Sequence, residues 1–174
     1  GLSCSDINVL QDIIDVNPSL NGENALEIGT QVWSATNGRL TELRLTNNQL
    51  SEQLTQIPES IGNLSKLEYL ALNDNALTTI PESICQLSSL HYLGLATNYL
   101  TDLPSCICAA CGDSECSIRV FENCLDDAYN YQCNQNFNFS GGSGQSSCCE
   151  DANGDDLCDE WQGTVTDIDG NTYK

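Results

Sequence analysis

The sequence predicts an α/β solenoid: a coil of short parallel strands with a helical cap before it and a disulfide-rich cap after it. Three observations predict this fold. A leucine pattern recurs three times within residues 38–110, an apolar pattern of helical spacing precedes it, and nine of the eleven cysteines follow between 106 and 158. We divide the chain into an N-terminal cap (1–37), repeats (38–110), a Cys-rich cap (111–139), a Gly/Ser linker (140–147) and an acidic calcium-loop-like segment with a terminal hairpin (148–174).

Cysteine content and charge limit the possible functions. Eleven cysteines in 174 residues are typical of an oxidising compartment, so we expect an extracellular protein, secreted or on a cell surface. The start, Gly1-Leu2-Ser3-Cys4, has no signal-peptide pattern, so we expect any such peptide to have been removed. No apolar run approaches the roughly 18 residues that span a bilayer. The net charge of −20 has the wrong sign for binding phosphates, which argues against nucleic acid.

The N-terminal cap begins with a predicted helix over residues 6–15. Its apolar residues have helical spacing, and Asp6 lies at the start, where the helix dipole favours an acid. Asn17-Pro18 ends the helix, because a residue before proline disfavours helical backbone angles. Residues 26–33 then predict a strand carrying Trp33. A three-turn coil needs such caps, because its end turns have no neighbour.

The repeats share the pattern Leu-xx-Leu-x-Leu-xx-Asn-x-Leu, beginning at Leu40, Leu67 and Leu90, spacings of 27 and 23 residues. Alternating leucines place one face of a short strand in the interior. The asparagine amide can bond the backbone of the following turn, and a later proline fixes φ as the chain leaves the strand side. We expect the four extra residues of the first repeat, around 51–54, to bulge on the convex side.

These residues closely resemble the leucine-rich-repeat family over about residues 38–110. The resemblance implies a curved solenoid with strands on its concave face, and usually a binding role. No catalytic activity follows from the fold itself.

Strand alternation predicts which residues face outward on the concave side. The predicted columns are Glu42, Tyr69, Tyr92; Arg44, Ala71, Gly94; Thr46, Asn73, Ala96; and Asn47, Asp74, Thr97. Two stacked tyrosines beside small residues predict a shallow aromatic groove for a peptide strand or a sugar. The alternative is that the tyrosines serve only to stack with each other as good strand residues. The candidate binding residues are Glu42, Arg44, Tyr69, Asn73, Asp74, Tyr92 and Thr97.

The cysteines predict disulfides. Cys85 and Cys108 occupy the same place in successive turns, so we expect their backbones within bridging reach and predict a Cys85–Cys108 disulfide. The run from Cys106 to Cys116 has an alternative as a zinc or iron–sulfur ligand set, but disulfides are favoured in so cysteine-rich a chain. The odd count singles out Cys4 for an intermolecular bridge or a free thiol.

The acidic segment carries oxygen ligands at alternating positions, which suits a hard cation. It resembles the calcium loops of thrombospondin type 3 and dockerin-like repeats, although Asp156 replaces the usual Gly and Gln162 the usual Glu, which weakens the expected affinity. The alternative is a solvated acidic turn stapled by Cys149 and Cys158. The candidate Ca²⁺ ligands are Asp151, Asn153, Asp155, Leu157 (by its carbonyl) and Asp159.

Residues 164–173 predict a hairpin around Asp-Gly-Asn. They also resemble the opening of the Fibrobacter major paralogous domain. Sequons at Asn63 and Asn138 allow glycans.

The sequence favours a binding function over catalysis. The single histidine, His91, has no Ser-His-Asp spacing, so we expect no enzyme activity. We expect recognition or cell adhesion through a protein or glycan ligand. The alternative is a structural subunit that self-assembles into an extracellular fibre or surface coat through its ends, Cys4 and the C-terminal strand.

Overall fold

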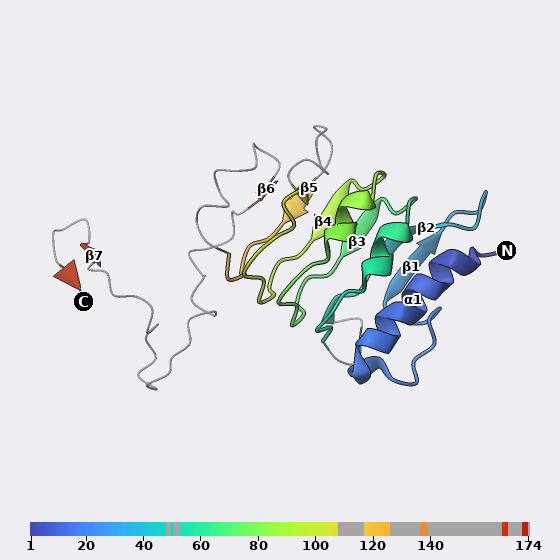
Figure 1. Ribbon diagram of the computed structural model, residues 1–174, viewed down its shortest axis with the longest axis horizontal. Helices are drawn as coiled ribbons and strands as arrows, with labels where there is room; N and C mark the ends of the chain where they lie inside the picture. Colours follow the sequence, from blue (N-terminus) through green and yellow to red (C-terminus); the bar gives the residue numbers. More distant parts are fainter. Residues whose placement is uncertain are drawn as a thin grey trace.

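The computed structural model describes residues 1–47, 50, 53–107 and 117–125 in full, and the backbone of strand segments 137–138, 165–166 and 172–173. Six strands form one sheet in chain order, β1-β2-β3-β4-β5-β6 (Figure 1). The strands are β1 (Thr30–Trp33), β2 (Leu40–Arg44), β3 (Tyr69–Ala71), β4 (Tyr92–Gly94), β5 (Ser117–Arg119) and β6 (Phe137–Asn138). Pairing from β2 to β6 is parallel, whereas β1 pairs antiparallel with β2. This confirms the predicted solenoid-like coil of parallel strands.

Helices form a second row opposite the strands. In the described part of the chain these are the α-helix α1 (Cys4–Val16) and the short 3-10 helices η1 (Pro18–Leu20), η3 (Glu59–Asn63) and η4 (Glu82–Gln86). Helix α1 contacts η3, and η3 contacts η4, so α1 continues the row of 3-10 turns beyond the first repeat (Figure 1). None of the helices in the described ranges is long and apolar enough to cross a membrane.

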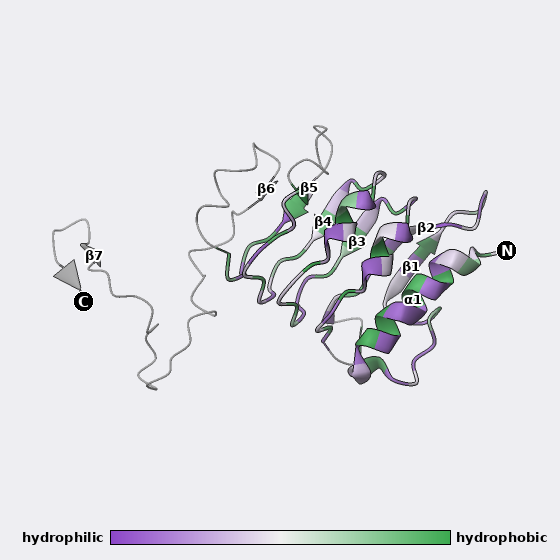
Figure 2. Ribbon diagram, in the orientation of Figure 1, coloured by the Kyte–Doolittle hydropathy of each residue, from purple (hydrophilic) through white to green (hydrophobic). Residues whose placement is uncertain are grey.

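The N-terminal cap contains the predicted helix followed by a strand, but the strand begins at Thr30, four residues later than predicted. Hydrophobic and hydrophilic residues alternate along α1, as expected of a helix with one buried face (Figure 2). Its apolar side chains Val9, Leu10, Ile13 and Ile14 are buried in the core. The helix ends at Val16, immediately before Asn17-Pro18. Strand β1 then carries Trp33, whose ring packs partly buried against the core.

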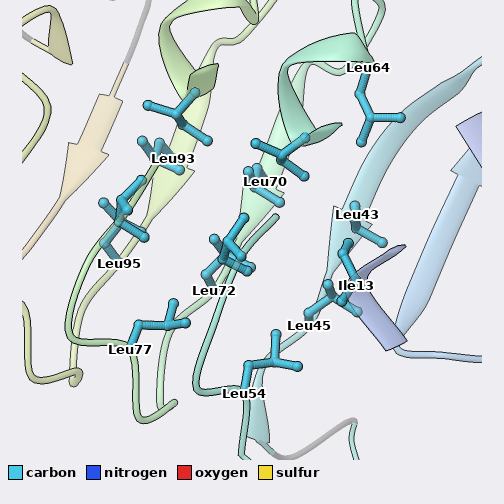
Figure 3. Close-up of a cluster of buried hydrophobic side chains, with 14 of the residues drawn as sticks. Ile13, Leu43, Leu45, Leu54, Leu64, Leu70, Leu72, Leu77, Leu93 and Leu95 are labelled. Carbon is cyan, nitrogen blue, oxygen red and sulfur yellow. The ribbon is translucent and has the colours of Figure 1, made fainter. Parts of the chain in front are cut away.

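The core is a stack of leucines between the strand row and the helix row. Leu43, Leu70 and Leu93 come from matching positions of successive strands and lie side by side in Figure 3. Each is at most 1% exposed. Removing such a side chain from water contributes about 2 kcal/mol, so the repeated leucines supply much of the stability of the coil.

A row of buried asparagines holds successive coils together. Asn98 Nδ2 donates to the carbonyls of Leu72 (2.9 Å) and Leu95 (3.0 Å), and its Oδ1 accepts from the Leu77 N–H (3.1 Å). Asn75 and Asn123 make the same kinds of bond one coil earlier and one coil later. This confirms the predicted role of the repeat asparagine and adds that each amide also reaches the preceding coil.

The solenoid continues past the end of the leucine pattern. Strand β5 extends the parallel sheet, Ile118 and Val120 are buried, and Asn123 joins the asparagine row. Strand β6 adds one more parallel pairing at Ile118↔Phe137. The parallel sheet therefore extends beyond residue 110, where the leucine spacing placed the last repeat.

The predicted C-terminal hairpin is confirmed at the backbone level. Strand β7 (Val165–Thr166) pairs antiparallel with β8 (Thr172–Tyr173), with Val165 opposite Tyr173. The proposed bulge around 51–54 includes residues 51 and 52, which lie outside the described part of the chain.

Candidate binding surface on the sheet

The strand register brings outward side chains of successive coils into rows. The first row contains Glu42, Tyr69, Tyr92 and Ser117, and the second contains Arg44, Ala71, Gly94 and Arg119. We call the outward surface of β1–β5 the strand face. It corresponds to the predicted concave face.

Four side chains of these rows stack on one another. The rings of Tyr69 and Tyr92 have centroids 4.2 Å apart and planes 7° from parallel. The guanidinium carbon of Arg44 lies 4.3 Å from the Tyr69 centroid, and that of Arg119 lies 5.7 Å from the Tyr92 centroid. We call these four residues the arginine–tyrosine ladder. Because a cation is attracted to the face of an aromatic ring, the ladder occupies the tyrosine faces and leaves the ring edges toward solvent.

The two ends of the ladder differ in charge compensation. Arg44 Nε donates to Glu42 Oε1, and this hydrogen bond raises the pKa of Arg44 above its ordinary value. Arg119 is exposed and forms no ion pair with any carboxylate in the described ranges. Burial, followed by the neighbouring Tyr92, raises the pKa of Tyr69, so its phenol stays neutral. The ladder therefore presents one guanidinium that is paired with a carboxylate through its Nε and one that is unpaired within the described residues.

The small-residue strip does not form the predicted open groove. Ala71 is only 3% exposed and Gly94 is buried. A Cβ on Gly94 would lie 2.6 Å from Asn73 Nδ2, so the Asn73 amide fills the space that the missing side chain leaves. Asn73 Oδ1 also accepts from the Ala96 N–H at 3.0 Å, which makes Asn73 a link between coils. A side chain at position 94 would have to displace the Asn73 amide from this place.

Asp74 and Thr97 lie just beyond the strands, away from the ladder. Asp74 (φ 59°), Thr97 (φ 56°) and Glu122 (φ 55°) precede the three asparagines of the row and share left-handed backbone angles. Thr97 Oγ1 donates to Glu122 Oε2 at 2.8 Å. Of the seven predicted binding residues, the structure thus brings together Glu42, Arg44, Tyr69 and Tyr92.

Three residues of the strand face named here were missed from the sequence: Arg119, Ser117 and Val32. Arg119 completes the ladder, and Val32, the register partner of Glu42, extends the face onto β1 with 45% of its surface exposed. The sequence did contain a pattern that indicates the position of Arg119. Ile118-x-Val120-xx-Asn123-x-Leu125 repeats the spacing with Ile and Val in place of Leu, inside a segment otherwise dominated by cysteines.

The predicted Cys85–Cys108 disulfide is wrong, because Cys85 is bonded to Cys106, with Cα atoms 6.1 Å apart. Side chains at equivalent positions of two stacked coils extend in the same direction. A disulfide needs one side chain that points toward the next coil and one that points back toward the preceding coil. These two directions occur at different positions of the repeat. Cys124 is also disulfide-bonded, and Cys4 is the free, exposed cysteine of the described residues.

The remaining predicted sites are untested. The calcium ligands Asp151, Asn153, Asp155, Leu157 and Asp159 lie outside the described residues. Asn138 is in β6, where only the backbone is described. Asn63 is exposed at the end of η3, as a glycan acceptor must be. His91 is exposed just before β4.

The parallel sheet, the leucine core and the asparagine row define the class: a leucine-rich solenoid. Residues 38–100 match the family model described as Leucine rich repeat. The leucine-rich-repeat ectodomain of the receptor kinase SOBIR1 from Arabidopsis thaliana is 28% identical, with a TM-score of 0.53 and coverage of 71% of this chain and 70% of that chain. A leucine-rich-repeat protein from Leptospira interrogans is 30% identical, with a TM-score of 0.46 and coverage of 55% of this chain and 23% of its own. No curated protein matches the sequence.

The family-model match and the similarity to the plant ectodomain support the assignment of a leucine-rich-repeat protein. Proteins built from such repeats generally recognise other proteins, because stacked strands create an extended surface with room for many side-chain contacts.

Proposed function

We propose that this chain is an extracellular recognition module that binds an extended segment of a protein partner across its strand face. The single observation that carries the proposal is the arginine–tyrosine ladder. Tyrosine and arginine are enriched among residues that dominate binding energy at protein interfaces, and here they are gathered on one face from four strands.

The ladder favours a protein ligand over a glycan. A sugar ring stacks on an open aromatic face, but the faces of Tyr69 and Tyr92 lie against each other and under the two arginines. What remains available is a line of ring edges, hydroxyl groups and guanidinium N–H groups. Such groups suit the carbonyl, hydroxyl and carboxylate acceptors of a peptide.

An extracellular location is supported by two kinds of observation. The Cys85–Cys106 bridge and the bonded Cys124 require oxidising conditions to persist. The similar plant structure is an ectodomain, the extracellular part of its receptor.

The test starts from a displayed library of random peptides selected on the full chain. Replacing both Tyr69 and Tyr92 by Ala should weaken the selected peptides at least about tenfold, measured by fluorescence anisotropy, because interface tyrosines often contribute more than 1.4 kcal/mol. Tyr99→Ala is the matched control, since Tyr99 is 47% exposed and lies beyond β4. It should leave binding unchanged.

A second variant tests the same surface in case the double replacement does not fold. Ser117→Trp adds bulk beside Tyr92 on the first row and leaves the four side chains of the ladder in place. It should block binding while circular dichroism remains native. Selected peptides that bind both variants as tightly as the unaltered chain would refute the strand face as the binding site.

The alternative, a self-assembling structural subunit, has one observation in its favour. Strand β1 forms the N-terminal edge of the sheet, and the exposed Val32 lies on it. Light scattering over a concentration series separates the two functions. Our proposal expects monomers at every concentration, whereas polymers that grow with concentration under reducing conditions would favour the structural role.

A further inference from the structure

We propose that the arginine–tyrosine ladder selects an acidic peptide: an extended segment with two carboxylates four residues apart, one at each guanidinium. This rests on the proposed function and adds the chemistry and spacing of the ligand. The residue midway between the two acids would lie over the edges of the tyrosine pair.

The first step is the span of the ladder. Its three centre-to-centre steps are 4.3 Å from Arg44 to Tyr69, 4.2 Å from Tyr69 to Tyr92, and 5.7 Å from Tyr92 to Arg119. The two guanidinium carbons are therefore at most about 14 Å apart, which equals three strand spacings of about 4.8 Å. The row runs across the strands, along the axis on which the coils stack.

The second step is the length of a ligand that matches this span. An extended peptide rises about 3.4 Å per residue, so about four residues cover the ladder. Side chains at i, i+2 and i+4 point to the same side of an extended chain, whereas i+3 points away. Acids at i and i+4 meet both arginines, and the side chain at i+2 meets the aromatic pair.

The third step is the set of donors left unused. Arg44 gives its Nε to Glu42, and its Nη groups donate to no acceptor within the described part of the chain. Arg119 likewise has no hydrogen-bond acceptor there. Both guanidinium groups already lie over tyrosine rings in the chain without a ligand. Arginine N–H groups pair well with carboxylates because the planar fork matches the two oxygens.

The net charge of −20 acts only weakly on this local preference. At physiological ionic strength, charges farther than about 8 Å act weakly on a surface contact. Near the ladder, Glu42 is held by Arg44, and the carboxylate of Glu122 accepts from Thr97. The negative charge of the whole chain slows the encounter with an acidic peptide, while the ladder supplies the local positive charge.

The experiment uses three labelled peptides that differ only in their acids. One carries Glu at i and i+4 with Leu at i+2 in a threonine-rich strand sequence, one carries Gln at both positions, and one carries Glu at i and i+3. We expect fluorescence anisotropy to show about threefold weaker binding for each guanidinium left without a carboxylate, the scale of an exposed ion pair. The i+3 peptide should leave one guanidinium unpaired, and the Gln peptide both.

Variants of the chain assign the effect to the ladder. Arg119→Gln should weaken the i/i+4 peptide about threefold and leave the Gln peptide unchanged. Glu42→Gln should strengthen the i/i+4 peptide, because it releases Arg44 from its internal partner. Lys66→Gln is the control for net charge, since Lys66 is exposed in the turn before β3, and it should change neither peptide.

The outcomes separate this inference from the proposed function. Equal binding of the Glu and Gln peptides, or a selected library whose tyrosine-dependent binders lack paired acids, would overturn the acidic selectivity and leave the strand face as the binding site. If the library peptides bind equally well with and without Tyr69 and Tyr92, both the acidic selectivity and the strand face as the binding site are overturned. A measurable preference for the i/i+4 peptide over the i/i+3 peptide that disappears in Arg119→Gln supports both.

Discussion

Asp6 shows how much a single side chain contributes to this fold. Its carboxylate is fully buried and accepts from Arg39 Nε (2.8 Å to Oδ2) and from the Leu40 backbone N–H (2.9 Å). Arg39 in turn donates through Nη2 to the Asn63 carbonyl. The residue expected to favour the helix dipole therefore links α1, β2 and the end of η3. The N-terminal cap is held in place by a specific polar contact as well as by apolar packing.

Replacing Asp6 with Asn should lower the free energy of unfolding by about 3 kcal/mol, because Arg39 would keep a partly buried charge without its partner. Urea unfolding followed by circular dichroism measures the change. Asp12→Asn is the matched control on the same helix and should cost less than about 0.5 kcal/mol. Equal effects of the two replacements would contradict the structural role of Asp6.

At the scale of elements, the unit of this molecule is a coil defined by its asparagine. In segment 117–125, Ile118 and Val120 take the places of leucines, and Asn123 makes the same kinds of bond that Asn98 makes one coil earlier. Apolar identity is exchangeable because burial requires only volume and hydrophobicity. The asparagine is harder to replace, since it must both donate and accept within the closed turn.

Asn123→Ala should therefore destabilise the chain by about 2–4 kcal/mol, because the Leu95 and Val120 carbonyls and the Leu100 N–H would lose buried partners. Thermal and urea unfolding provide the measurement. Asn8→Ala, an exposed replacement on α1, should be neutral or slightly stabilising because alanine favours helix. A neutral Asn123→Ala would mean that segment 117–125 is not an integral coil.

For the whole molecule, stability depends on how each coil meets the next. The strands stack in register through the sheet, while on the other side the Cys85–Cys106 bridge ties η4 to the following coil. At each contact between coils, the surface of one coil that faces the C-terminal end of the stack packs on the surface of the next coil that faces the N-terminal end. The ladder arises from the same stacking, because only the assembled sheet places Arg44 and Arg119 at opposite ends of one tyrosine pair.

Mass spectrometry of a non-reduced digest should find Cys85 linked to Cys106. Replacing both by Ala should lower the free energy of unfolding by about 3 kcal/mol, because the bridge closes a loop with a sequence separation of 21. Cys4→Ala is the control, since Cys4 is free and exposed, and it should have no effect. A Cys85–Cys108 peptide would contradict the bridge seen here.

The sequence alone was sufficient for what depends on local pattern. The spacing of the leucines predicted the coil, and the apolar face of residues 6–15 predicted the helix. Such predictions succeed because buried positions recur in the sequence with the period of the secondary structure. Alternation on the strands also identified Glu42, Arg44, Tyr69 and Tyr92 as outward neighbours, since parallel coils keep equivalent residues in register.

Only the tertiary structure decided what depends on contacts between coils. Three such contacts join residues at non-equivalent or distant positions: the pairing of Cys85 with Cys106, the Asn73 amide beside Gly94, and buried Asp6 against Arg39. Repeat spacing carries no information on such pairs. It states which residues are buried, whereas the direction of each side chain toward the next coil is set by how the coils stack.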